Sequence, residues 1–170
     1  MKKLFLVLFA VCFITACQKE KQRYFFDSAE IETLKSGIKA YEAQDWDKWK
    51  SNFADTAKVY ANSKKGVSAD ERIESFNSML AYFSSYGFEE KGSFSEMVID
   101  KDDETWVNYW GNWKGTLKAN NQEISIPVHL TAQFIDGKIV KEYAYYDTYG
   151  VNTAISEIEA AKMAEEIPSE

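Results

Sequence analysis

The first part of the folded chain has apolar side chains at helical spacing. The residues that repeat every three to four positions are Ile31, Leu34, Ile38 and Tyr41. Asp27 precedes this stripe and has an acidic residue three positions later, which is the spacing of a helix N-cap and its partner. The pattern therefore predicts an amphipathic helix over residues 28–43.

Two more helices and a short strand are predicted before the pattern changes. Asp45 can cap a short helix that carries three aromatic residues on one side, Trp46, Trp49 and Phe53. Residues 58–61 are a short strand candidate. Ser68 and Glu71 have the spacing of a capping box, and the stripe that follows consists of Ile73, Phe76, Leu80 and Phe83. Gly87 suits the C-terminal end of this helix.

From residue 88 onward the apolar period changes from helical to two. Four strand-like segments follow, at residues 88–100, 105–118, 123–135 and 138–149. Their connections are short, and Asp136-Gly137 is a hairpin turn signal, so consecutive strands are expected to be antiparallel. In the third segment the even positions from Ile124 to Phe134 are apolar, and His129 lies on the opposite side. Pro127 cannot donate to a ladder and marks an edge position or a bulge.

Helices followed by an antiparallel meander define an α+β domain. A long curved sheet around the first helices would form a cone with a cavity between sheet and helices. The last segment, residues 152–170, is rich in Ala and Glu and has only a weak helical stripe.

Two motifs resemble those of a known family. Asp45-Trp46-Asp47-x-Trp49-x-x-x-Phe53-Ala54-Asp55 resembles the start of a nuclear transport factor 2-like domain of the SnoaL-like polyketide cyclase branch. Phe134-Ile135-Asp136-Gly137-Lys138-Ile139, followed by Tyr145-Tyr146-Asp147, is similar to the last hairpin of that family. The resemblance covers about residues 28–150 and implies a cone-shaped α+β barrel, with the N-terminal helices packed in a curved antiparallel sheet. It implies no single activity, because one fold hosts many functions.

The N-terminus has the order of a secretory signal. Lys2 and Lys3 precede an apolar run over residues 4–14, which is too short to span a bilayer. Thr15-Ala16-Cys17 resembles a bacterial lipobox, and this resemblance implies cleavage before Cys17 and attachment of lipid to it. The expected protein is exported and membrane-anchored, at the outer membrane or the periplasmic face. Gln18-Lys19-Glu20-Lys21 also resembles a signal for the cell surface.

The predicted organisation has four parts. Residues 1–16 are the signal peptide, 17–27 the lipidated cysteine and its tether, 28–150 the nuclear transport factor 2-like domain, and 151–170 an acidic tail or loose helix.

Composition narrows the classes of partner. The 170-residue chain has a formal charge of −7, with 20 basic and 27 acidic residues. Loss of residues 1–16 would remove two lysines and change the charge to −9, which argues against nucleic acid as a partner. It would also remove Cys12 and leave Cys17 as the only cysteine, so no disulfide is expected. The single histidine and the absence of metal or phosphate motifs in the sequence predict neither metal nor cofactor.

Two side chains are candidates for acid/base chemistry. His129 is the only imidazole, and Asp147 ends the last strand. The family resemblance implies a His or Asp in the cavity as the acid/base of its enzymes, and an aspartate on a late strand. The alternatives are a histidine without chemistry and a carboxylate in water or capping a turn.

A group of aromatic and amide side chains is the candidate ligand site. It consists of Trp106, Asn108, Trp110, Tyr143 and Tyr145. In a second interpretation aromatic rings simply fill the cone. In a third, the outer rings cover an interface, since the resemblance implies dimers formed through the convex face of the sheet.

The sequence therefore favours a lipid-anchored envelope protein that binds a small, partly apolar ligand or a partner protein. The first alternative is a cyclase, isomerase or dehydratase-like enzyme, which needs His129 or Asp147 to face an open cavity. The second is a structural or assembly module with a closed cavity.

Overall fold

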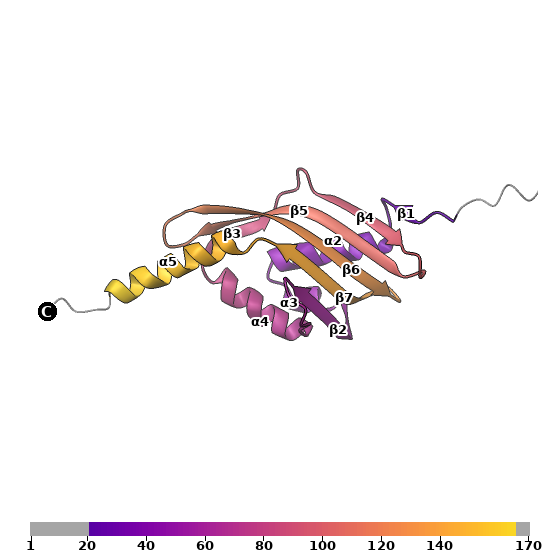
Figure 1. The fold of residues 1–170 in the computed structure, drawn as a ribbon, viewed down its shortest axis with the longest axis horizontal. Helices are drawn as coiled ribbons and strands as arrows, with labels where there is room; N and C mark the ends of the chain where they lie inside the picture. Colours follow the sequence, from indigo (N-terminus) through magenta and orange to yellow (C-terminus); the bar gives the residue numbers. More distant parts are fainter. Residues whose placement is uncertain (1–20, 166–170) are drawn as a thin grey trace, which may run out of the picture.

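The structure, a computed structural model, describes residues 21–165 and has helices packed on one side of a curled sheet (Figure 1). Seven strands form this sheet in the order β1-β4-β5-β6-β7-β2, and β3 pairs with β5 beside β4. The strands are β1 (Tyr24–Phe25), β2 (Phe53–Ala61), β3 (Phe83–Phe88), β4 (Phe94–Ile99), β5 (Thr105–Leu117), β6 (Glu123–Ile135) and β7 (Lys138–Tyr146). The helices are α2 (Ala29–Glu42), α3 (Trp46–Lys50), α4 (Ala69–Leu80) and α5 (Tyr149–Glu165). The α+β class and the cone shape are confirmed.

The first two helices begin at side-chain caps. Ser28, not Asp27, is the N-cap of α2, and its hydroxyl accepts a hydrogen bond from the Ile31 amide at 3.1 Å. The N-cap of α3 is Asp45, as predicted, and it accepts from the Lys48 amide at 3.0 Å. Phe53 does not continue α3 but begins β2, so this strand is longer than the predicted 58–61.

The third helix is shorter than its apolar stripe suggested. Ser68 and Glu71 form the predicted capping box. The helix ends at Leu80, however, and Phe83 begins β3 opposite Leu117 of β5. Phe83 is buried in either arrangement, so the apolar spacing predicted its burial but not its element.

The predicted strand over residues 88–100 is not one strand: it contains Phe88, the last residue of β3, then a connection over residues 89–93, and then β4. Strand β3 pairs with the second half of β5 and β4 with the first half, so they lie end to end along one edge. The chain leaves that edge between them, where Gly92 has a φ of 88°. This left-handed conformation suits glycine because it has no Cβ.

The sheet is mixed, which corrects the expected antiparallel sheet. Pairings between β4, β5, β6 and β7 are antiparallel, as their short connections predicted. At the other edge, β2 pairs with β7 in parallel, because helix α4 and four strands, β3 to β6, lie between them in the chain and allow a crossover. Pro127 lies one position beyond the last β6–β7 pair, so this part of β6 is an edge and the missing N–H costs no ladder bond there.

The C-terminal segment is a packed helix over part of its length. Val151, Ala154 and Ile158 of α5 are buried, although the sequence showed only a weak stripe. No helix within residues 21–165 is long and apolar enough to cross a membrane. Cys17 and the predicted signal lie outside the described residues, and the domain boundaries stay predictions.

Candidate functional site

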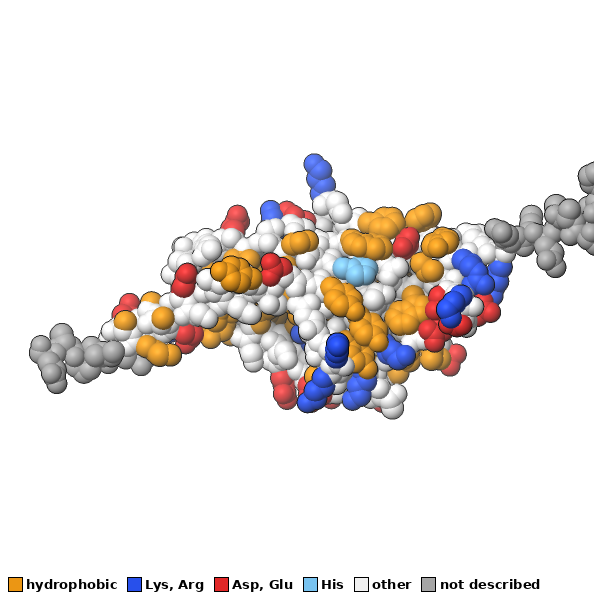
Figure 2. Space-filling model, in the orientation of Figure 1, with side chains coloured by type: hydrophobic (Ala, Val, Ile, Leu, Met, Phe, Trp, Pro, Cys, Tyr) orange, Lys and Arg blue, Asp and Glu red, His pale blue; other side chains and the backbone are white. Residues whose placement is uncertain are grey.

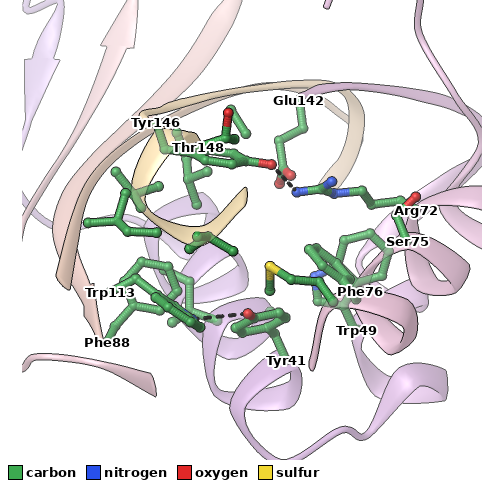
Figure 3. A pocket seen from close by; sticks show the side chains of 18 of the residues that line it. Tyr41, Trp49, Arg72, Ser75, Phe76, Phe88, Trp113, Glu142, Tyr146 and Thr148 are labelled. Carbon is green, nitrogen blue, oxygen red and sulfur yellow. Dashed lines mark hydrogen bonds between the residues drawn. The ribbon is translucent and has the colours of Figure 1, made fainter. Parts of the chain in front are cut away.

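A cavity of about 330 Å³ lies between the helices and the concave face of the sheet (Figure 3). Helices α2, α3, α4 and α5 supply one part of its wall, and strands β3, β5, β6 and β7 supply the rest. The apolar wall includes Leu34, Ile38, Trp49, Phe76, Met79, Phe88, Trp113, Ile126, Val128, Leu130 and Ile155. The aromatic side chains therefore do not fill the cone, as the closed-cavity alternative required.

Tyr41 contacts two of the other aromatic residues that line the cavity, Phe76 and Trp113. Its ring packs edge-on against Phe76, with centroids 4.8 Å apart, and its hydroxyl accepts a hydrogen bond from Trp113 Nε1 at 3.0 Å. Burial raises the pKa of Tyr41, so the hydroxyl stays neutral. The ring and the hydrogen bond fix the indole of Trp113 on the cavity wall.

Three polar side chains meet on the other side of the cavity, where Arg72 of α4 points toward Glu142 and Tyr146 of β7 (Figure 3). The guanidinium lies 4.2 Å from the ring centroid of Phe76, and Nη2 donates to the Tyr146 hydroxyl at 3.1 Å. Arg72 Nε is buried and has no hydrogen-bond partner among residues 21–165. The guanidinium is thus oriented by two neighbours, while its buried Nε–H lacks an acceptor.

Glu142 is a buried carboxyl group, with 7% of its surface exposed. Burial raises its pKa from 4.5 to about 7, and the positive charge of Arg72 opposes that rise. A carboxyl group of this kind can either donate or accept a hydrogen bond near neutral pH. The cavity therefore contains the cation of Arg72 and the carboxyl group of Glu142, which can gain or lose a proton near neutral pH.

A bulge in β7 brings Glu142 to the concave face. On the β6 side, Gln133 and Phe134 are consecutive, but their partners on β7 are Lys141 and Ile139. Val140 is the extra residue, and it reverses which positions of β7 face inward. Ile139 is buried before the bulge, whereas Glu142, Ala144 and Tyr146 line the cavity after it.

Four of the predicted site residues lie on the opposite, convex face. Trp110 stacks on His129 with centroids 4.7 Å apart, and His129 faces Tyr145 at 6.3 Å. Tyr143 is next to Tyr145 at 6.5 Å. Figure 2 shows the imidazole at the surface between apolar side chains.

The other predicted residues also lie outside the cavity. Trp106 donates to Glu104 at 3.2 Å, and Asn108 donates to Glu96 at 3.4 Å. Asp147 is exposed and accepts from the Tyr149 amide at 2.8 Å, which is the turn-capping alternative.

These positions correct the expected site. The aromatic residues were expected to line the cavity, and they lie outside it. For Tyr143 and Tyr145 the reason is the bulge, which changes the facing of β7, whereas Trp110 of β5 shares the outer face with its partner His129 in an unshifted register. Neither His129 nor Asp147 lines the cavity, so the condition for the enzyme hypothesis through these two residues is not met.

The sequence contained weak signals for the polar cluster. Arg72 precedes Phe76 by four positions, so it lies on the same face of the predicted helix. Nothing in the local sequence singles out Glu142, because its inward position depends on the bulge. Within residues 21–165, no group of three or more His, Cys, Asp or Glu side chains could hold a metal ion.

The comparisons with known proteins concern the fold. No protein-family model matches the chain, and no curated protein matches it. AclR of Streptomyces galilaeus, assigned as a hydroxylase, superposes with a TM-score of 0.60 at 14% identity, covering 75% of this chain and 96% of AclR. A Shewanella denitrificans protein assigned to the SnoaL-like polyketide cyclases gives 0.59 at 13% identity, covering 77% and 99%.

A third similar structure contains a bound small molecule. It is a Catenulispora acidiphila protein with a ketosteroid isomerase-like fold, in complex with trimethylamine. It superposes with a TM-score of 0.56 at 11% identity, covering 71% of this chain and 88% of its own. Together these likenesses show that the chain has the nuclear transport factor 2-like fold, shared by SnoaL-like and ketosteroid isomerase-like proteins. At sequence identities of 11% to 14%, these likenesses show a shared fold and do not show a shared activity.

Proposed function

We propose that the protein binds a small, mostly apolar molecule in the cavity between the helices and the sheet. The observation that carries this proposal is the cavity itself, whose wall is mostly apolar. Its polar part consists of the cluster of Arg72, Glu142 and Tyr146 and of the uncharged side chains of Ser75, Thr148 and Asn152. Its volume of about 330 Å³ lies at the lower end of the range for small-molecule sites. The trimethylamine complex supports ligand binding by a protein of this fold.

A pair of serines on α4 allows a matched test. Both are exposed on the helix, but Ser75 is in the cavity wall and Ser78, three positions later, is not. Both hydroxyls donate to the backbone carbonyl four residues earlier at 2.9 Å, so the two positions are locally equivalent. Ser75→Trp should obstruct the cavity, while Ser78→Trp should not.

The measurement is isothermal titration calorimetry with 4-phenylbutanol. Wild type and Ser78→Trp should bind this probe, and Ser75→Trp should bind it at least tenfold more weakly. Equal affinity in all three proteins would contradict binding in the cavity.

A second candidate function is proton transfer at a carbon next to a carbonyl group. It is favoured by the pKa of about 7 for Glu142, which suits a group that takes up and returns a proton at neutral pH. The ionised carboxyl would remove the proton from carbon, and Arg72 or the Tyr146 hydroxyl would donate a hydrogen bond to the enolate oxygen. The similarity to proteins assigned as polyketide cyclases supports this class of chemistry.

Deuterium exchange tests this candidate. In D2O, the protein should speed up loss of the α-proton signals of 4-phenylbutan-2-one in proton NMR. Glu142→Gln should abolish that effect, and the exposed control Glu74→Gln should keep it. Equal exchange with all three proteins would reject the role of Glu142.

The envelope location is part of the proposal. It is supported by the order of segments at the N-terminus, where two lysines are followed by an apolar run over residues 4–14 and then by Thr15-Ala16-Cys17. Lipid on Cys17 would anchor the domain to the membrane. Cys17→Ser should release the protein into the soluble fraction, whereas Cys12→Ser should leave it with membranes. A Cys17→Ser protein that stays with the membranes would contradict the anchor.

A homodimer through the convex face of the sheet is also proposed. Its support is a row of aromatic residues across the strands, in which Trp110 is 39% and Tyr145 51% exposed. Wild type should sediment as a dimer, and Trp110→Glu should sediment as a monomer. A wild-type protein that is monomeric at high concentration would contradict this interface.

A further inference from the structure

We infer that the ligand of the cavity is an apolar monocarboxylic acid, which binds as an anion against Arg72 and shares one proton with Glu142. This inference rests on the proposed binding function and specifies its ligand class. Two separate observations support it: an unused donor on Arg72 and a buried carboxyl group without a partner.

The unused donor is Arg72 Nε. It is buried and unpartnered among the described residues, although the same guanidinium is held by Phe76 and by the Tyr146 hydroxyl. A buried donor without an acceptor is rare in folded proteins because its desolvation is not compensated. An oxygen of a ligand in the cavity would supply the missing acceptor.

A ligand oxygen that carries a negative charge would also balance the positive charge of Arg72. Within residues 21–165 the guanidinium makes no ion pair at 4.0 Å or less. A ligand carboxylate has two oxygens and would neutralise that charge in a site that excludes water. An alcohol would add no negative charge beside the cation, and an amine would add a second positive charge.

Glu142 determines the proton content of the complex. Its carboxyl group has no hydrogen bond to another described residue, and Arg72 of α4 is the charged group that faces it. The hydroxyl groups of the cavity wall belong to Tyr41 on α2, Ser75 on α4, Tyr146 on β7 and Thr148. Two adjacent carboxylates would repel each other, so the acid binds when Glu142 carries a proton and donates it in a hydrogen bond.

The remainder of the cavity selects an apolar body for the ligand. Opposite the polar cluster lie the rings of Phe88, Trp113 and Tyr41, together with aliphatic side chains of β6. This wall offers dispersion and ring contacts but few hydrogen bonds. The site therefore fits one carboxyl group at one end of an apolar chain or ring.

Three probes with the same skeleton test the ligand class on the wild-type protein. They are 4-phenylbutanoate, 4-phenylbutanol and 4-phenylbutylamine, each titrated by calorimetry at pH 7. The acid should bind at least tenfold more tightly than the alcohol, and the amine should bind most weakly. Repeating the acid titration in phosphate and in Tris measures the protons taken up, because the two buffers differ in ionisation enthalpy.

The pH dependence has a defined direction. Above pH 7 free Glu142 is increasingly ionised, so binding at pH 8 should take up close to one proton. The affinity should fall about fivefold between pH 7 and 8 and about tenfold per pH unit above pH 8. Below pH 6 the uptake should disappear. Glu142→Gln should remove both the proton uptake and the loss of affinity between pH 7 and 8.

Variants of the two arginines complete the test. Arg72→Gln should remove the preference for acid over alcohol, whereas Arg23→Gln, which alters the arginine outside the cavity wall, should keep it. The probe series needs no variant, so the inference stays falsifiable if Arg72→Gln does not fold.

The outcomes separate this inference from the function on which it rests. Alcohol binding equal to or tighter than acid binding would overturn the inference and leave cavity binding intact, and so would tightest binding by the amine. Acid binding without proton uptake at pH 8 would overturn the shared proton. If none of the three probes binds, both the inference and the proposed function fail.

Discussion

Replacing Glu142 with Gln should remove a pH dependence of the free energy of unfolding. Burial raises the pKa of this carboxyl group from 4.5 to about 7 in the folded protein, so the folded state holds the proton more tightly than the unfolded chain does. This contribution to stability is complete below about pH 4.5 and is lost as the pH rises through 7. The difference corresponds to about 3 kcal/mol, at about 1.4 kcal/mol for each tenfold change in proton affinity.

The assay is urea unfolding at pH 5, 6, 7 and 8, followed by tryptophan fluorescence. Between pH 5 and 8, wild type should lose about 2 to 3 kcal/mol more stability than Glu142→Gln. Other shifted groups act outside this range: hydrogen bonds lower the pKa of Glu71 and Glu89, so their contributions are lost in acid, and desolvation raises the pKa of Tyr86, which titrates in alkali.

Glu74→Gln is the control because Glu74 is an exposed residue of the same helix as Arg72. Its profile should match that of wild type. Parallel profiles for wild type and Glu142→Gln would refute the reasoning, because they would mean that Glu142 has the same proton affinity in the folded and unfolded states.

Three other substitutions should change stability by amounts that chemical denaturation can measure. Tyr41→Phe leaves the buried Trp113 Nε1–H without its acceptor and should cost about 1 to 3 kcal/mol. Ser68→Ala removes the N-cap of α4 and should cost about 1 kcal/mol. Gly115→Ala places a methyl group against the rings of Trp113 and Phe83 and should cost about 1 to 3 kcal/mol.

Each of these substitutions has a matched control. Trp113→Phe in the Tyr41→Phe background removes the donor that lacks an acceptor. The loss of stability in the double variant should therefore be smaller than the sum of the losses in the two single variants. Ser78→Ala lies within α4 and should be nearly neutral. Gly150→Ala meets no atom within 4 Å and should not destabilise, so a loss equal to that of Gly115→Ala would contradict the steric argument.

Local signals in the sequence predicted the helix starts well. Asp45 and Ser68 cap their helices through contacts within three residues, and such contacts are determined by adjacent sequence. The end of α4 was less predictable, because Phe83 continues the helical spacing. Pairing of Phe83 with Leu117, 34 positions later, decides that it belongs to a strand.

The candidate site was less predictable than the fold. Alternation along β6 correctly divided an apolar face from the face with His129, and the apolar face lines the cavity. On β7 the same reasoning failed. A regular hairpin through Asp136-Gly137 would place Lys141 opposite Ala132, but the bulge places Glu142 there. No local feature of the sequence marks Val140 as the inserted residue.

Burial of charge explains why the bulged register is the stable one. Ala132 is fully buried, and directly paired residues of antiparallel strands share one face of the sheet. Without the bulge, Lys141 would point into the apolar interior, and a lysine there would be buried without a carboxylate partner. With the bulge, Lys141 reaches solvent, and the residue that turns inward is Glu142, which can lose its charge by taking up a proton. The cavity therefore contains a protonatable acid beside Arg72, while Tyr143 and Tyr145 join His129 and Trp110 outside. The bulge at Val140 thus determines which side chains of β7 face the cavity and which lie on the outer face of the sheet.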